Sequence, residues 1–298
     1  MDAPAAEVHI DAALVERLIE AQHPDLAAPV RLVTNGWDNA LFRLGDRHAV
    51  RLPRREAAAE LVVNEQRWLP DLTKRLPVPV PVPVRRGAPG IGYPWSWSIT
   101  DWFDGTDADL VPAAERAAVA IELAEFLAAL HHEAPTSAPF NPVRGVPLPT
   151  RSAAMVGRLD SGSLPRVDDL RALWNRLVTT PPWGARPVWL HGDPHPGNAI
   201  MTTDAAAAPR LAAILDFGDI TAGDPATDLA AAWMWFEPAG RALFRAHIDE
   251  LCHVDTHTWQ RARGWALNMG AAIAAASDDN PRLAAIGAHT LTQVLLDD

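Results

Sequence analysis

Two short polar motifs carry the residues of this chain whose types and spacing could do chemistry. The first reads His-Gly-Asp-Pro-His-Pro-Gly-Asn at residues 191–198, and the second, Asp-Phe-Gly at 216–218, starts eighteen residues after Asn198. A carboxylate can take the proton of a hydroxyl group, and amide and carboxylate oxygens are ligands that suit Mg²⁺. In this order the motifs supply a proton acceptor and two metal ligands, which are polar groups that phosphoryl transfer requires.

Each group can be assigned a role from its position. Asp193 is the candidate for the group that accepts the proton of the acceptor hydroxyl, and Asn198 and Asp216 are the candidate Mg²⁺ ligands. Phosphoryl transfer asks the protein mainly to position the reactants and to neutralise charge. The prolines and the glycine between Asp193 and Asn198 disfavour a helix, so we expect a rigid loop that holds these two residues in a fixed relation.

Apolar segments precede both motifs, at residues 188–190 and 211–215. They predict two buried strands that end where the polar groups begin. Either motif alone is also typical of an ordinary loop, since Asp, Asn, Gly and Pro are common turn formers; their order after two apolar strands favours the site. A zinc pair of His191 and His195 is a rival interpretation, but their spacing of four suits zinc on a helix, which the prolines prevent.

The motifs also carry a resemblance. The spacing from Asp193 to Asn198 is that of the protein-kinase catalytic loop, with His-Gly-Asp in place of His-Arg-Asp. Together with residues 214–219 and the Gly-Asp-Pro-Ala-Thr-Asp-Leu-Ala run at 223–230, the chain resembles the aminoglycoside phosphotransferase family, which includes macrolide and other antibiotic kinases. The resemblance extends from about Val33 to the C-terminal helices. It implies an α+β, two-lobed, protein-kinase-like fold, with a small β-rich N-terminal lobe and a larger, mainly helical C-terminal lobe.

The resemblance also implies roles for individual residues. Asp193 would be the catalytic base, and Asn198 and Asp216 the metal ligands. Asp228, on the helix after the second motif, would brace the catalytic loop through its backbone, and His191 would also support the loop. From the residues alone, Asp228 is equally well explained as a carboxylate in the first turn of a helix, where the helix dipole favours it.

We expect the nucleotide in the N-terminal part of the chain. Residues 11–22 have the apolar spacing of a helix, and residues 31–34, 40–44 and 48–52 read as three strands joined by turns. A kinase fold covers the triphosphate with the turn between its first two strands, which here contains Gly36 and Asn39. A single glycine is also ordinary hairpin chemistry.

Arg51 stands where the kinase pattern has a lysine that holds the nucleotide phosphates and pairs with a helix glutamate. Arginine keeps the charge and can bind phosphate oxygens in a bidentate manner, although its geometry differs from that of lysine. The partner candidates lie on the helix predicted at 56–69. Glu65 is preferred to Glu60 because it lies at the edge of the apolar face, and an exposed glutamate without this role is the alternative.

The boundary between the lobes is predicted from residues 77–103. Alternate prolines at 77–84 lack N–H groups, so this stretch is extended or an edge strand and cannot be a central strand. Residues 93–103 read as a strand that leaves the small lobe. In a kinase-like fold its end is the hinge, where adenine would bond to the backbone of Thr100, Asp101, Trp102 and Phe103. The expected lobes are therefore residues 1–103, which bind nucleotide, and 104–298, which hold the catalytic and acceptor sites.

The rest of the chain is predicted to be largely helical, at 113–131, 228–236, 241–251, 259–276 and 281–296, with a proline-rich loop at 134–149. His131 and His132 are interpreted as capping groups at a helix end. By resemblance, the C-terminal helices shape the acceptor pocket. The candidate acceptor contacts are Trp233, Trp235, Trp265, Glu237, Asp278 and Asp279, although most of the 12 tryptophans should simply pack.

Composition narrows the class of protein. The chain has 298 residues, 48% of them hydrophobic, which is enough for a sizeable core, and it contains no apolar run long enough to span a membrane. A formal net charge of −11 argues against nucleic acid as a partner. It fits either a cationic acceptor or general solubility. The single cysteine, Cys252, is expected to be a buried, inert thiol, and with no secretion signal the cytoplasm is the expected location.

These observations predict a phosphotransferase that uses Mg²⁺ and ATP, or GTP, to phosphorylate a hydroxyl group of a small molecule. An aminoglycoside or macrolide acceptor rests on the resemblance alone. The alternatives are a kinase of a cellular metabolite (an amino sugar, a choline-like alcohol or a hydroxy amino acid) and a nucleotide-binding regulator without turnover, which Arg51 and the sparse glycine turn would fit. The sequence leaves the oligomeric state open.

Overall fold

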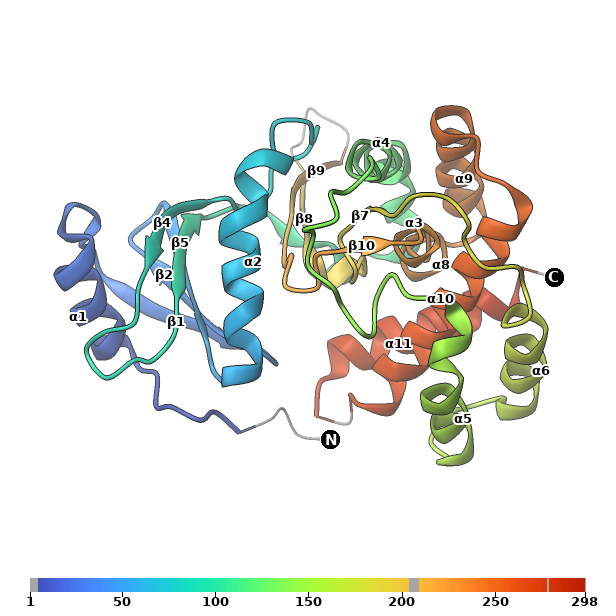
Figure 1. The fold of residues 1–298 in the computed structure, drawn as a ribbon, viewed down its shortest axis with the longest axis horizontal. Helices are drawn as coiled ribbons and strands as arrows, with labels where there is room; N and C mark the ends of the chain where they lie inside the picture. The colour runs from blue at the N-terminus through green and yellow to red at the C-terminus, as the bar shows by residue number, and fades with distance from the viewer. Residues whose placement is uncertain (1–4, 204–208, 278, 298) are drawn as a thin grey trace.

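A β-rich part and a larger helical part lie side by side in the computed structural model of the chain, which describes residues 5–203, 209–277 and 279–297 (Figure 1). Each part has its own hydrophobic core. Phe42 and Trp97 are central to the smaller core, and Phe217 and Trp265 to the larger one. This is the α+β, two-lobed organisation that the sequence predicted.

The small lobe is a five-stranded antiparallel sheet with the order β1-β2-β3-β5-β4. Its strands are β1 Val30–Asn35, β2 Asn39–Leu44, β3 His48–Pro53, β4 Pro83–Gly87 and β5 Trp97–Asp101. Helices α1 (Ala12–Gln22) and α2 (Glu56–Leu72) accompany the sheet, and the Asp11 side chain caps α1 by accepting the Leu14 N–H (2.8 Å). The predicted helices and strands are all present here, and α2 runs three residues past its expected end.

The alternating prolines lead into β4, which is an edge strand, as their missing N–H groups predicted. Val78 and Val80 are both buried, and they pack with the end of α2 into the core of the large lobe. The proline segment therefore fastens α2 and the sheet to the helical lobe.

The large lobe holds the remaining helices, and two of them differ from the prediction. The single helix expected at 113–131 is divided into α3 (Ala113–Arg116), a 3-10 turn (Ala117–Val119) and α4 (Ala120–Leu130). Gly240 of α9 packs against Ala117 so closely that a Cβ on the glycine would lie 3.0 Å from the Ala117 Cβ. The chain tightens into the 3-10 turn at this close contact.

The helix expected at 228–236 likewise appears as α7 (Ala226–Leu229) and α8 (Ala231–Trp235). It starts two residues early because the Asp224 carboxylate accepts the Ala226 N–H (3.0 Å). Helices α5 (Ser152–Asp160) and α6 (Val167–Leu177) were not predicted, although the buried positions 170, 173, 174 and 177 have helical spacing. The last three helices are α9 (Pro238–Cys252), α10 (Thr256–Ala275) and α11 (Pro281–Leu295), close to their predicted bounds.

Short strands carry the two polar motifs. β7 (Val188–Leu190) pairs with β10 (Thr221–Gly223), and β8 (Ala199–Thr202) lies between β6 (Thr106–Asp107) and β9 (Arg210–Ile214). β7 ends where the first motif starts, and β9 ends just before the second. Both predicted strands exist and are largely buried.

Cys252 corrects the prediction of a buried thiol, because its side chain is exposed. It lies in the last turn of α9, beyond Ile248, the last buried residue of that helix. Among the described residues, no helix is long and apolar enough to cross a membrane.

Candidate active site

Asp228 holds the backbone at the start of the first motif. Its side chain is fully buried, and its carboxylate accepts the N–H groups of His191 (2.8 Å) and Gly192 (2.9 Å). Gly192 has φ +89°, and a Cβ there would lie 2.5 Å from the Asp219 carbonyl oxygen, so only glycine fits. His131 also contacts this carboxylate, with 3.1 Å between Nε2 and Oδ2. His131 thus does more than end α4, which corrects its interpretation as a cap alone.

His191 links the two motifs. Its Nε2 lies 2.8 Å from the Leu215 carbonyl oxygen and its Nδ1 accepts the Asp193 N–H (3.2 Å), so the proton is on Nε2. Both ring nitrogens are therefore occupied within the protein. This arrangement rules out the zinc pair of His191 and His195, and no group of three or more metal-binding His, Cys, Asp or Glu side chains occurs among the described residues.

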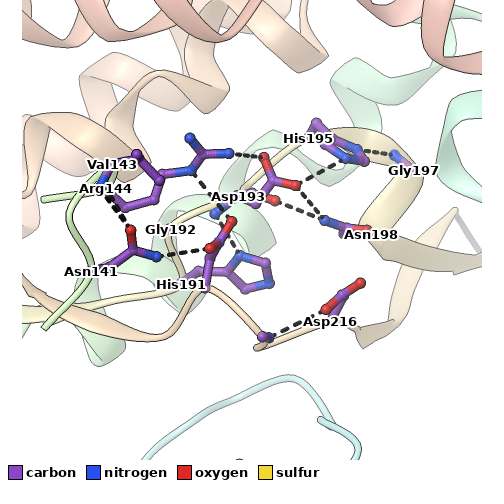
Figure 2. Close-up of polar contacts among 12 residues, drawn as sticks. Asn141, Val143, Arg144, His191, Gly192, Asp193, His195, Gly197, Asn198 and Asp216 are labelled. Carbon is purple, nitrogen blue, oxygen red and sulfur yellow. Dashed lines mark hydrogen bonds and ion pairs between the residues drawn. The ribbon is translucent and has the colours of Figure 1, made fainter. Parts of the chain in front are cut away.

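Three side chains surround the Asp193 carboxylate (Figure 2). His195 Nε2 lies 3.3 Å and Asn198 Nδ2 3.4 Å from its Oδ2, and Arg144 Nη2 lies 3.4 Å from its Oδ1. Burial would raise the pKa of Asp193, but the positive charges of His195 and Arg144 outweigh it and hold the pKa well below its usual range. Asp193 is therefore ionised and able to accept a hydrogen bond from an approaching hydroxyl.

Asn198 and Asp216 are held next to each other because the Leu215 N–H donates to the Asn198 carbonyl oxygen (2.8 Å). Asp216 has φ +57°, in the left-handed region, and its side chain is about half exposed (52%). Asp216 Oδ1 accepts the Gly218 N–H (3.2 Å). The part of the carboxylate that is buried would raise the pKa of Asp216, but the charge and the hydrogen bond of Arg51 outweigh this and lower the pKa below its usual value.

The donor atoms of this pair fit Mg²⁺. Asn198 Nδ2 donates to the Asp193 carbonyl oxygen (2.9 Å), so its amide oxygen is the atom left for a cation. Asp216 adds a charged oxygen on the same side. One amide and one carboxylate suit a magnesium ion whose remaining ligands are phosphate oxygens and water.

Arg51 joins the sheet, α2 and the second motif. Its Nη1 donates to Glu65 Oε1 (2.6 Å) and its Nη2 to Asp216 Oδ1 (2.5 Å). Glu65, not Glu60, is thus the glutamate that pairs with Arg51. Burial raises the pKa of Glu65 to about 7 even though Arg51 lowers it. When its amide oxygen faces Arg51, Asn39 also accepts from Nε and Nη2 at 3.0 Å.

The remaining predicted nucleotide contacts lie in the β1–β2 turn and at the end of β5. Gly36 closes the β1–β2 turn by donating its N–H to the Asn39 carbonyl oxygen (2.9 Å). Thr100 and Asp101 end β5, and Phe103 follows in the connection to the large lobe. The Trp102 N–H donates to the Arg47 carbonyl oxygen (2.8 Å), so this donor is already occupied within the protein.

Sequence reasoning missed three residues of the site: Asn141, Arg144 and Asp219. The Asn141 side-chain oxygen accepts the N–H groups of Val143 and Arg144, and its nitrogen donates to Asp219 Oδ1 (2.8 Å). Arg144 Nε lies 3.5 Å from Asp219 Oδ2. Burial raises the pKa of Asp219, against the effect of Arg144. The sequence predicted only a proline-rich loop at 134–149, and no local pattern shows that this loop folds onto a motif fifty residues away.

The suggested acceptor contacts divide in two. Trp233, Trp235 and Trp265 are buried packing residues, and Trp235 Nε1 supports the catalytic loop by donating to the Pro194 carbonyl oxygen (2.7 Å). Glu237 and Asp279 lie on the surface. Asp278 lies outside the described residues.

Replacing Asp228 with alanine should lower the free energy of unfolding by about 2–6 kcal/mol, since two buried N–H groups each lose their acceptor at about 1–3 kcal/mol. Urea unfolding measures this change. Asp46→Ala, at an exposed turn position, is the matched control and should change the value by less than about 0.5 kcal/mol. Equal effects of the two substitutions would contradict the bracing role.

Comparisons with known proteins bear on the family and the fold. Residues 29–265 match the model of the phosphotransferase enzyme family. A search of curated proteins gave no match. Among solved structures, the chain is similar to the GDP complex of wild-type aminoglycoside 2'-phosphotransferase-IIIa, with a TM-score of 0.69 and 19% identity over 96% of this chain and 99% of that one.

Two macrolide enzymes give similar values. Macrolide 2'-phosphotransferase type I has a TM-score of 0.63 and 21% identity over 96% of this chain and 98% of that one. The macrolide 2'-phosphotransferase of Brachybacterium faecium has a TM-score of 0.62 and 20% identity over 94% and 98%. At these identities the similarity establishes the fold, and it confirms the fold class expected from the sequence.

Proposed function

Because the chain belongs to the phosphotransferase enzyme family, we propose that it transfers the γ-phosphoryl group of ATP, or GTP, to a hydroxyl group of a small molecule. The observation that carries this proposal is the position of the Asp193 carboxylate beside Asn198, whose backbone pairs with Leu215, the residue before Asp216. Phosphoryl transfer needs a base and metal ligands that lie close together in space, and the spacing of these residues in the sequence is typical of such a site.

Asp193 would orient the acceptor hydroxyl and take its proton. The acceptor oxygen then forms the new bond to the γ-phosphorus, the bond from that phosphorus to the β–γ bridging oxygen breaks, and the nucleoside diphosphate leaves. Asn198 and Asp216 would hold Mg²⁺, which supplies charge neutralisation on the phosphate oxygens. His191 and Asp228 position the loop through its backbone.

Arg51 would bind the nucleotide phosphates, with Glu65 fixing its direction. Gly36 and Asn39 would cover the triphosphate from the β1–β2 turn. Adenine would meet the backbone at residues 100–103, where the Trp102 N–H is already bonded to the Arg47 carbonyl oxygen. We place the lobe boundary between residues 103 and 104, since β5 ends at Asp101 and β6 already pairs with the large lobe.

Replacing Arg51 with alanine should raise the KM for ATP by about 10- to 150-fold, the equivalent of about 1.5–3 kcal/mol for a hydrogen bond to a charged group. The KM for the acceptor should stay within about twofold, because Arg51 lies on the nucleotide side. Initial rates at varied ATP and acceptor measure both constants. Arg51→Lys keeps the charge and should recover part of the loss. Equal increases in the two KM values would contradict this role.

The structurally similar enzymes are named for aminoglycosides and macrolides, which makes these antibiotics the first acceptors to test. A hydroxyl-bearing cellular metabolite is the second, and we place the enzyme in the cytoplasm, where nucleotide and Mg²⁺ occur. ADP release across an acceptor panel tests the proposal, with phosphorylated product identified by mass. Raised tolerance of a sensitive host to an aminoglycoside or macrolide would support an antibiotic acceptor. Nucleotide binding without turnover on any acceptor would favour a regulator.

A further inference from the structure

Three arginines follow one another in the sequence at seven-residue intervals: Arg144, Arg151 and Arg158. We call them the arginine row, and the row starts beside the loop that carries Asp193. Arg144 contacts Asp193, as Figure 2 shows. Arg151 ends a 3-10 turn (Leu148–Arg151) that continues directly into α5, which contains Arg158. A spacing of seven residues places Arg151 and Arg158 on one face of this helical segment, two turns apart. The row therefore leads from the proposed base along α5.

The charges of the three guanidinium groups oppose one another. Burial, followed by the charge of Arg144, lowers the pKa of Arg151. Burial, followed by the charges of Arg151 and Arg144, lowers the pKa of Arg158. Like charges held together raise the free energy of the folded protein, and a bound anion would offset this cost.

Counter-charges reach only one end of the row. Arg144 forms ion pairs with Asp193 (3.4 Å) and Asp219 (3.5 Å). No ion pair joins Arg151 or Arg158 to a carboxylate within the described part of the chain. Arg158 Nη1 donates to the neutral amide oxygen of Asn268 (3.1 Å), and the buried Arg151 Nε has no hydrogen-bond partner there. Three cations thus face two anions, in a chain whose net charge is −11.

The segment that carries Arg151 and Arg158 packs closely against α10. Leu148 packs on Gly264 of α10, where a Cβ on the glycine would lie 2.4 Å from Leu148 Cδ2. Asn268, four residues further along α10, is buried and holds Arg158. The loop before this segment, which carries Arg144, is bonded to the residue that follows β10. The Asp224 N–H donates to the Gly145 carbonyl oxygen (3.2 Å). The arginines are therefore prepositioned, and the site does not depend on a flexible surface loop.

We infer that Arg144, Arg151 and Arg158 bind an anionic group of the acceptor, a carboxylate or a phosphate, on the same molecule as the hydroxyl that meets Asp193. This inference rests on the proposed phosphotransfer and narrows its acceptor. It favours a hydroxyl-bearing acid, such as the hydroxy amino acid among the metabolite alternatives, over a polycationic aminoglycoside. Arginine suits this task because its planar donors match both anions in a bidentate manner.

A panel of charge-matched acceptors tests the inference. It contains hydroxy amino acids and their amides, sugar phosphates and their free sugars, an aminoglycoside and a macrolide, and ADP release measures kcat/KM for each. The anionic member of at least one pair should react at least about tenfold faster than its neutral counterpart, a difference of about 1.4 kcal/mol. The pair that shows the difference distinguishes carboxylate from phosphate. Equal or faster turnover of the neutral or cationic acceptors would overturn the inference.

The double variant Arg151→Gln, Arg158→Gln should remove this preference by raising the acceptor KM at least about tenfold, with the ATP KM within about twofold. Because both arginines lie on the proposed acceptor side, away from Arg51, the acceptor KM should change and the ATP KM should not. Arg17→Gln, on the exposed face of α1, removes a charge from the other lobe and should change neither constant. An unaltered preference in a folded double variant would contradict the assignment.

A binding measurement separates failure of the inference from failure of the proposed function. If no acceptor of any charge is turned over, the phosphotransfer proposal fails, and the row is tested alone with inorganic phosphate and with citrate at constant ionic strength. Either anion should raise the Tm of the wild type above that in chloride by at least about 2 °C more than in the double variant. Equal shifts in the two proteins would overturn the anion site.

Discussion

Replacing Asp193 with asparagine should lower the acceptor-dependent kcat by about 10²- to 10⁴-fold, the usual contribution of a positioned proton acceptor. The amide keeps the size of the side chain but can no longer take the hydroxyl proton. Nucleotide affinity should remain within about threefold of wild type, because the contacts of the Asp193 side chain, with Arg144, His195 and Asn198, all lie within the large lobe. Steady-state ADP release and titration with nucleotide measure the two quantities.

Asp46→Asn is the matched control for this substitution, since it makes the same chemical change at an exposed turn of the small lobe. It should leave both constants unchanged. Loss of nucleotide binding in Asp193→Asn would indicate a misfolded loop. Full activity with intact binding would remove Asp193 from the reaction.

Replacing Asp216 with asparagine is the second large effect. It removes the negative charge of the proposed Mg²⁺ pair and, with it, the ion pair to Arg51. The Mg²⁺ concentration for half-maximal activity should rise at least about tenfold, and kcat/KM should fall by at least about 100-fold, because a metal ion supplies several kcal/mol of charge stabilisation. Activity measured over a Mg²⁺ series, with nucleotide fixed, gives both values.

Asp219→Asn separates this effect from a general loss of negative charge. Asp219 lies three residues from Asp216 and pairs with Asn141 and Arg144 on the acceptor side. Its substitution should alter the acceptor KM and leave the Mg²⁺ requirement unchanged. A Mg²⁺ requirement that is the same in Asp216→Asn and wild type would contradict the assignment of Asp216 as a metal ligand.

The sequence predicted the parts of the site that are local in the chain. The strands before the two motifs follow from apolar patterns, and the choice of Glu65 as the partner of Arg51 follows from the kinase pattern and the apolar face of α2. The motif residues were found for the same reason, since Asp193 and Asn198 are five positions apart on one loop. The predicted starts of α1 and α11 are correct to within one residue, at the Asp11 cap and at Pro281, whereas α9 and α10 start three residues before their predicted starts.

Contacts between distant segments could not be predicted in this way. Arg144 reaches Asp193 only because the loop between α4 and α5 crosses the β7–β10 pair, and nothing near Arg144 in sequence signals that path (Figure 1). His131 looked like a helix cap because its contact with Asp228 spans 97 residues. The same holds for the divided helix at 113–130, where close packing by Gly240 changes a pattern that is helical by itself.

The central claim is that this chain moves a phosphoryl group to a small-molecule hydroxyl by means of Asp193. The most direct measurement incubates wild type and Asp193→Asn with γ-labelled ATP, Mg²⁺ and the acceptor panel, and follows the label into product. We predict that wild type labels at least one acceptor in amounts equal to the ADP formed, and that Asp193→Asn binds ATP but labels none above background. Label that appears only as inorganic phosphate, or equal labelling by both proteins, would contradict the account.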